Sequence, residues 1–255
     1  MGGGRLTGLV VTAAVAGSIA FGSGPAAAIA PPHGLFQPLA PSYRAATLTR
    51  DGADIFGLRA ATARGATVIG GARNTDSNSR GVFWPRGQTP VARQQSCVTL
   101  SSKVGPFVQQ GIALRIAKAP SGAVRAITVT NHVYGNPANP PTFVFNVHFW
   151  HSDLVPAFQQ IAVADLRSTL APFGVALPYP WRLCARVQGR LLMFQVWPAD
   201  APTPRWDDLQ HGRVLHLPPG LGHPGYAGWY VGHLGAGDSA SYRNPVTGEP
   251  TALPH

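Results

Sequence analysis

The chain has few acidic residues and almost no glutamate. Its 255 residues include 10 acidic and 20 basic ones, and the single glutamate is Glu249, close to the C-terminal end. Glycoside hydrolysis commonly uses two carboxylates held about 5–9 Å apart, which on a β-strand requires acidic residues two or four positions apart. No strand-like segment shows such alternation. This argues against glycosidase chemistry, although two aspartates distant in sequence could still converge.

Lysine is nearly absent as well. Only Lys103 and Lys118 occur, so the net charge of +10 comes almost entirely from arginine. A basic surface favours acidic polysaccharides, anionic envelopes or nucleic acids as partners. The arginines are scattered singly, without a basic run or a nucleic-acid-binding motif, and this argues against a nucleic-acid partner. The arginine bias, together with abundant alanine, glycine and proline, also fits a genome rich in G and C.

Cysteine is scarce, and the two that occur are Cys97 and Cys184. Each lies in a strand-like segment. An even number of cysteines in an exported chain predicts one disulfide, which here would join an early strand to a late one. Two buried free thiols are the alternative. In the chain-entropy model a bridge that closes a loop of this length stabilises the fold by about 4–5 kcal/mol.

Long apolar segments are absent except near the N-terminal end. Arg5 is followed by an apolar stretch with small residues at 6–21 and by Ala26-Ala27-Ala28, the pattern of a secretory signal peptide. We expect residues 1–28 to be the signal peptide; cleavage after Ala30 also fits the pattern. An uncleaved anchor is the alternative, but the apolar stretch is short and interrupted by glycines. We therefore expect a protein that is secreted or associated with the cell envelope, without a stable membrane anchor.

Glycine and proline are abundant, with 30 and 25 residues, and predict many turns and few long helices. We expect an irregular N-terminal arm at 29–45, followed by one domain at 46–255. The clearest strand is 142–150, where side chains alternate between two faces. Phe143, Phe145, Val147 and Phe149 lie on one face of this strand, and Val144, Asn146, His148 and Trp150 lie on the other. Further strands are predicted at 67–72, 81–84, 97–101, 111–117 and 124–133.

The region 181–244 indicates more strands. Apolar runs at 183–187 and 191–197 flank Gln188-Gly189-Arg190, and a glycine between two such runs favours a tight hairpin. Pro198 ends the second run because proline cannot donate to a sheet. Residues 152–173 have apolar side chains at helical spacing and predict one helix; a strand at 161–166 is the alternative, because Val163 interrupts the apolar stripe.

These elements predict an all-β fold: an antiparallel two-sheet jelly-roll sandwich of about ten strands with one short helix. Segments 182–206 and 225–244 resemble the last strands of concanavalin A-like lectin and glucanase domains, laminin-G-like modules included. The matching features are a strand pair with a cysteine and a tryptophan, a proline–tryptophan segment at 204–206, and a closing strand rich in glycine and aromatic residues. We therefore expect a concanavalin A-like domain of an exported bacterial protein, and the resemblance implies a curved two-sheet sandwich whose concave face often receives sugar. In some members a calcium ion lies near one edge.

This pattern favours a non-catalytic module that binds carbohydrate or cell-envelope glycan. Trp206 and Trp150 are the candidate contacts, because indole rings stack on sugars. His148 and Asn146 share a strand face with Trp150 and are candidate hydrogen-bonding residues. Packing in the core is the alternative reading for both tryptophans.

Calcium is the one candidate cofactor. Asp76 and Asn78 place alternating oxygen atoms in a loop, as calcium ligands do, but the loop has no closing glutamate and an Asx-turn is the alternative. His148 and His151 form an H-x-x-H sequence, but on a strand they point to opposite faces and do not predict a zinc site.

Two other functional classes remain open. A polysaccharide lyase needs an arginine or asparagine to neutralise the carboxylate of a uronate, and a tyrosine or histidine to act as base. It does not need a pair of catalytic carboxylates. Residues of these types occur at Asn146, His148, Tyr230, His233 and Tyr242. The glutamine-x-histidine and tyrosine-lysine-glycine patterns of alginate-lyase-like jelly rolls are missing, and enzymatic activity is not our leading expectation. The third class is a structural or adhesion module that binds protein through a sheet edge.

Overall fold

The computed structural model describes residues 43–49, 56–62, 64–72, 74, 78–132 and 142–250. The predicted signal peptide, residues 29–42 of the predicted arm, and Asp76 lie outside the described residues. Within them the chain forms fourteen β-strands and one four-residue helix, α1 (Arg167–Leu170). The fold class predicted from the sequence is therefore confirmed.

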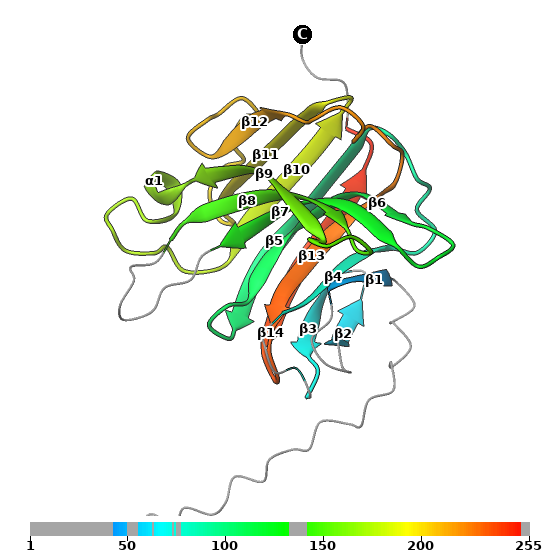
Figure 1. Ribbon diagram of the computed structural model, residues 1–255. Helices are drawn as coiled ribbons and strands as arrows, with labels where there is room; N and C mark the ends of the chain where they lie inside the picture. The colour runs from blue at the N-terminus through cyan, green and yellow to red at the C-terminus, as the bar shows by residue number, and fades with distance from the viewer. Residues whose placement is uncertain are drawn as a thin grey trace, which may run out of the picture. The chain divides into compact units, whose positions relative to one another are not determined.

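The strands form two antiparallel sheets of seven strands each (Figure 1). Sheet I has the order β1 (Tyr43–Thr49), β4 (Ser79–Pro85), β13 (Tyr226–Leu234), β6 (Gln109–Lys118), β7 (Val124–His132), β8 (Val144–His151) and β9 (Phe158–Asp165). Sheet II has the order β12 (Gly212–His216), β11 (Leu191–Pro198), β10 (Trp181–Gln188), β5 (Gln94–Val104), β14 (Ser239–Gly248), β3 (Gly65–Gly70) and β2 (Phe56–Thr62).

The main hydrophobic core combines alternate residues of both sheets. Trp229 of β13 stacks on Phe83 of β4, with ring centroids 4.1 Å apart, and also contacts Tyr242 of β14, at 4.5 Å. Because side chains alternate along a strand, the residues between these core positions point away from the other sheet. In sheet I these intervening residues form a second cluster of buried side chains, which includes Val82, Trp84, Trp150 and Tyr230. The sheet I face turned away from sheet II therefore has its own packed side chains.

The hairpin predicted around Gly189 is confirmed. Strands β10 and β11 pair from Trp181↔Pro198 to Gln188↔Leu191, and Gly189 has a φ of 56°, the left-handed conformation that glycine adopts readily. The strand predicted at 142–150 corresponds to β8. Strand β1 begins at Tyr43, so residues 43–45, expected to be irregular, are part of a strand.

The helix predicted at 152–173 is wrong. Residues 158–165 form strand β9, which pairs with β8, and only α1 is helical. Pairing with the edge of sheet I gives this segment backbone hydrogen bonds and places Ala164 in the core, so tertiary context outweighs the helical spacing of its apolar residues. Among the described residues, no helix is long and apolar enough to cross a membrane.

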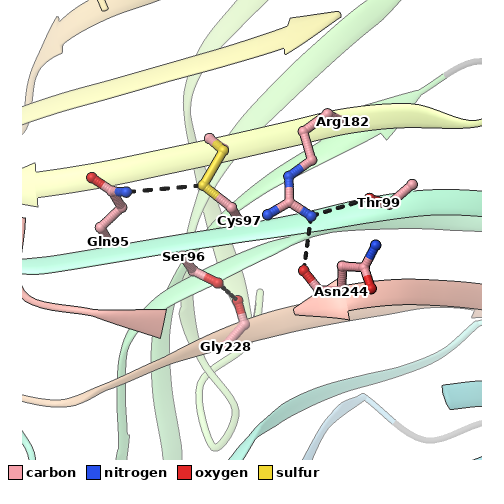
Figure 2. Close-up of a disulfide and its surroundings, with 8 residues drawn as sticks. Gln95, Ser96, Cys97, Thr99, Arg182, Gly228 and Asn244 are labelled. Atoms are coloured by element: carbon pink, nitrogen blue, oxygen red, sulfur yellow. Dashed lines mark hydrogen bonds between the residues drawn. A yellow bond between two sulfur atoms is a disulfide. The ribbon is translucent and has the colours of Figure 1, made fainter. Parts of the chain in front are cut away.

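The predicted disulfide between Cys97 and Cys184 is present. The two residues lie directly opposite each other in β5 and β10, with Cα atoms 4.1 Å apart. Figure 2 shows Cys97 and Arg182 on one side of sheet II, while Ser96 points to the other side. There the Ser96 hydroxyl donates a 2.8 Å hydrogen bond to the Gly228 carbonyl of sheet I. Cys97 and Arg182 therefore lie on the outer face of sheet II.

Candidate functional site

Polar side chains gather on the outer face of sheet I, because the strand register aligns them. Asn146 of β8 lies opposite Thr130 of β7, which lies opposite Gly111 of β6. In the next row His148 of β8 lies between Thr128 of β7 and Gln160 of β9. We call the group formed by Arg80, Gln109, His132, Asn146, His148 and Gln160 the sheet I polar cluster.

Aromatic rings pack beside this cluster. Trp150 contacts the rings of Phe158 and Tyr230, with centroids 5.0 and 6.3 Å away, and its indole N–H donates to the Thr128 hydroxyl at 2.9 Å. Only 1% of Trp150 is exposed, whereas 40% of Phe158 is exposed. The aromatic ring that sheet I presents to solvent here is therefore that of Phe158. Phe158 was not among the predicted binding residues, because its segment was predicted to be a helix.

Arg80 is held in place from several sides. Its Nη2 lies 2.8 Å from Nε2 of His233, and it also donates hydrogen bonds to the side chain of Tyr230 and, at 3.1 Å, to the hydroxyl of Thr49. The guanidinium lies over the Trp150 ring, 5.7 Å from its centroid. These contacts fix the orientation of the cation at the edge of the polar cluster.

Gly232 provides the space for the Tyr230 side chain. A Cβ atom at Gly232 would lie 2.0 Å from the Tyr230 hydroxyl and 3.0 Å from Cγ of Arg80. Any larger residue would therefore displace the ring that Arg80 contacts. Burial raises the pKa of Tyr230 to about 12, with Arg80 acting in the opposite direction, so the phenol is protonated at neutral pH.

His132 connects two amide side chains. Its Nδ1 lies 2.8 Å from Nε2 of Gln109 and 3.1 Å from Nδ2 of Asn146. With amide donors facing Nδ1, a neutral ring carries its proton on Nε2. Burial, assisted by the positive charge of Lys103, lowers the pKa of His132 and favours this neutral form.

His148 is neutral at physiological pH. Burial is the largest cause and the positive charge of Arg80 the second; together they lower its pKa to about 4, against the opposing effect of a hydrogen bond with Gln160. Its Nδ1 atom is buried and has no hydrogen-bond partner among the described residues. Buried polar atoms without a partner are uncommon in native proteins. The cluster thus combines one fixed cation with neutral groups that donate and accept hydrogen bonds.

Carboxylates are nearly absent from sheet I. Asp165, at the end of β9, is the only acidic residue in its seven strands, and its Oδ1 accepts a 2.8 Å hydrogen bond from the backbone N–H of Arg167. The strands of this sheet therefore offer no carboxylate pair. Among the described residues there is also no group of three or more His, Cys, Asp or Glu side chains that could hold a metal ion.

The structure brings together three of the four predicted carbohydrate-binding residues. Asn146, His148 and Trp150 lie on the outer face of sheet I, although Trp150 is buried beneath its neighbours. Trp206 lies elsewhere: it is half-buried against the disulfide and Trp197, with the Arg186 guanidinium 4.3 Å from its ring centroid. Arg80 and Gln160 were not among the predicted residues: Arg80 belongs to β4, far from β8 in the sequence, and Gln160 lies in the segment that was predicted to be a helix.

The calcium prediction is only partly within the described residues. Asn78 is exposed, and its Oδ1 accepts a hydrogen bond from Arg80. The role of Asn78 as a calcium ligand stays a prediction. A calcium site that uses Asp76 stays a prediction.

No family model matches the chain, and no curated protein matches its sequence. Similar solved structures include the exoplasmic/lumenal domain of VIP36 in its Ca2+/Man-bound form, with a TM-score of 0.48 and 12% identity over 86% of this chain and 90% of that one. The carbohydrate binding module CBM66 from Bacillus subtilis has a TM-score of 0.46 and 9% identity over 81% of this chain and 95% of that one.

A legume lectin-like domain from Entamoeba histolytica is similar to the same extent, with a TM-score of 0.46 and 10% identity over 85% of this chain and 96% of that one. Because the identities are 9–12% and the TM-scores are below 0.5, these similarities assign the chain to no family and identify no ligand.

Proposed function

We propose that the chain is an exported, non-catalytic module that binds carbohydrate or cell-envelope glycan on the outer face of sheet I. One observation carries this proposal. Asn146, His148 and Arg80, each with 7–9% of its surface exposed, lie on the same face as the Phe158 ring, which is 40% exposed. A partly exposed aromatic ring beside fixed polar side chains suits a sugar, which has an apolar ring face and a polar edge.

The polar groups match sugar hydroxyls. Each hydroxyl both donates and accepts a hydrogen bond, and the amides of Asn146 and Gln160 provide an acceptor oxygen and a donor N–H within one side chain. The neutral ring of His148 has one nitrogen that donates and one that accepts a hydrogen bond. Arg80 supplies donors only. A neutral or weakly anionic sugar therefore fits this face.

The residue types also support binding without hydrolysis. Paired carboxylates about 5–9 Å apart perform most glycoside hydrolysis, and Asp165 stands alone among the strands of sheet I. Export is supported by the disulfide, because such bonds persist in oxidising compartments outside the cytosol. The signal peptide at 1–28 remains part of the proposal.

The test is a glycan array with the purified oxidised protein, with and without calcium, followed by calorimetric titration of any glycan that binds. Matched variants on and off the face distinguish the site. Phe158→Ala should weaken binding about tenfold, whereas Phe173→Ala, which removes a 92% exposed phenylalanine outside the sheets, should leave it unchanged.

A second matched pair lies within β9. Gln160 lies opposite His148, whereas Gln159 lies opposite Phe149, whose side chain is on the other side of the sheet. Gln160→Ala should therefore weaken binding about fivefold and Gln159→Ala should not. If no glycan binds, or if the members of each pair behave alike, the proposal is wrong.

A specific observation also favours a second candidate, an acidic-polysaccharide lyase. Arg80 contacts both His233 and Tyr230, and these are the residue types that β-elimination from a uronate requires. The pKa of about 12 of Tyr230 weakens this candidate. Only about one Tyr230 side chain in 10⁵ is ionised at pH 7, and the ionised form is the one that would act as base. Incubation with polyuronates, monitored by the ultraviolet absorbance of unsaturated ends, tests it. Turnover that Tyr230→Phe abolishes would replace binding by catalysis as the function.

A further inference from the structure

The strands of sheet II carry basic residues and no acidic ones. Their seven sequences contain no aspartate or glutamate, and their basic residues are Arg59, Lys103, Arg182, Arg186, Arg213 and Arg243. A sheet that bears charge of one sign attracts ligands of the opposite sign. The question is whether some of these side chains surround a place where such a ligand could sit.

Two of these basic residues lie in one row on the outer face, with a threonine between them. Thr99 of β5 lies between Arg182 of β10 and Arg243 of β14. Figure 2 shows how Arg182 is fixed: its Nη1 donates to the Thr99 hydroxyl at 3.1 Å and to the Asn244 carbonyl at 2.8 Å. Arg243 and Asn244 themselves are exposed.

A hollow of about 690 Å³ is lined by Arg243 of this row and by residues of the neighbouring strands. Its walls include two arginines, five serine or threonine hydroxyls and one amide: Arg64, Arg243, Thr62, Thr67, Ser101, Ser102, Ser241 and Asn244. The Thr67 and Ser241 hydroxyls are 2.9 Å apart and hydrogen-bonded, which fixes two of these groups on neighbouring strands. The backbone N–H of Asn244 donates to the Arg64 carbonyl at 2.7 Å and holds the β2–β3 turn against β14. The volume falls within the range of about 300–1,000 Å³ that ligand sites occupy.

The described residues that line the hollow include no carboxylate. Ion pairs between described residues involve other arginines, namely Arg93 with Glu249 and Arg205 with Asp207, and none includes Arg64, Arg182 or Arg243. Guanidinium groups without a carboxylate partner bind carboxylate and sulfate groups through paired N–H donors. The adjacent hydroxyls and the amide suit the neutral parts of a sugar.

We propose that this hollow binds a short segment of an anionic polysaccharide, whose carboxylate or sulfate groups contact Arg64 and Arg243. A saccharide fits better than a nucleic acid, because single-stranded nucleic acids need exposed aromatic rings for base stacking. Among the described lining residues the one aromatic side chain is that of Tyr242, which is 2% exposed and whose hydroxyl donates to the Tyr230 carbonyl inside the sandwich. This site is on the opposite sheet from the polar cluster and does not depend on the function proposed there.

The test measures affinity for oligogalacturonate and for sulfated dextran by calorimetric titration, with neutral dextran and single-stranded DNA as comparison probes. Arg243→Gln and Arg64→Gln should each lower the affinity about tenfold for whichever anionic saccharide binds the original protein. Arg125→Gln and Arg167→Gln remove the same charge from exposed positions outside sheet II and should change affinity less than about twofold. Comparing the two saccharides distinguishes carboxylate from sulfate recognition.

Four results would overturn the proposal: no binding of either anionic saccharide, equal binding of neutral dextran, equal or tighter binding of DNA, or equal losses for all four arginine variants. The last result would assign binding to the net charge alone. Phe158→Ala, the variant that tests sheet I, should leave oligogalacturonate affinity unchanged. The two sites can therefore fail independently.

Discussion

Gln94 of sheet II accepts a 2.6 Å hydrogen bond through Oε1 from the backbone N–H of Arg115 in sheet I. Arg115 lies at an irregularity of β6, where φ is 51°, so its N–H needs a partner outside the normal strand pairing. The amide nitrogen of Gln94 donates to the carbonyls of Val91, at 2.7 Å, and Gly225. One fully buried side chain thus joins the two sheets and two loops.

Gln94→Ala should lower the free energy of unfolding by about 2–3 kcal/mol, because it leaves buried backbone groups without partners. Urea denaturation of the oxidised protein measures the change. The matched control is Gln159→Ala on the exposed strand β9, which should alter stability by less than about 0.5 kcal/mol. Equal effects of the two substitutions would show that the Gln94 contacts do not support the sandwich.

The strands could be predicted where one strand carries its own signal. In β8 the alternation of Phe145 and Val147 with Asn146 and His148 indicates both the strand and its polar face. Because residues two positions apart on a strand share a face, the same alternation also predicts that Asn146, His148 and Trp150 lie together. Strand β9 gave a weaker signal because its residues lie at a sheet edge, where Val163 is exposed and Ala164 is the one buried residue of the strand.

The rest of the candidate site depends on strand order and register, which cannot be inferred from the pattern of any single strand. Arg80 and His233 are 153 positions apart, and they meet because β4 and β13 are neighbours in sheet I. Gln160 lies beside His148 only through an irregular β8–β9 register. Burial of a single tryptophan depends equally on distant neighbours, which explains why Trp150 could not be identified as buried from its own strand.

Replacing both Cys97 and Cys184 by alanine should lower the free energy of unfolding by about 4–5 kcal/mol. The bridge joins residues 87 positions apart, and the expected loss follows from the chain entropy that it removes from the unfolded state. Urea denaturation of the oxidised protein and of the double variant checks the value. An unchanged midpoint would show that packing of Trp197 and Trp206 around this position, rather than the covalent bond, stabilises the strand pair.

Stability should fall as the pH decreases from about 6.5 to about 4, because of His148. The pKa of this residue is about 4 in the folded protein, compared with 6.5 for an unperturbed histidine, the value taken for the unfolded chain. Between these values the unfolded chain binds more protons than the folded one, so the contribution is fully present above pH 6.5 and is lost as the pH falls. The total change is about 3 kcal/mol, measured by urea denaturation across this pH range.

His148→Gln should flatten that pH dependence, since glutamine is neutral throughout. The lowered pKa values of His132 and His223 act in the same direction and leave a smaller slope in the variant. His216→Gln removes an exposed histidine and should leave the slope as it is in the original protein. A variant at His148 with an unchanged slope would assign the acid sensitivity to other groups.

Trp206→Ala tests whether this residue contacts glycan or supports sheet II. Its ring packs against the disulfide region and under the Arg186 guanidinium, which is itself 7% exposed and lies 3.4 Å from the Met193 sulfur through Nε. We expect the substitution to lower the free energy of unfolding by about 1–2 kcal/mol and to leave glycan affinity at sheet I within twofold of the original. Trp206→Phe, which keeps an aromatic face beneath Arg186, should restore most of the stability. Loss of glycan binding in Trp206→Ala, with stability unchanged, would instead move the sugar site to sheet II, because the two faces share no exposed side chain.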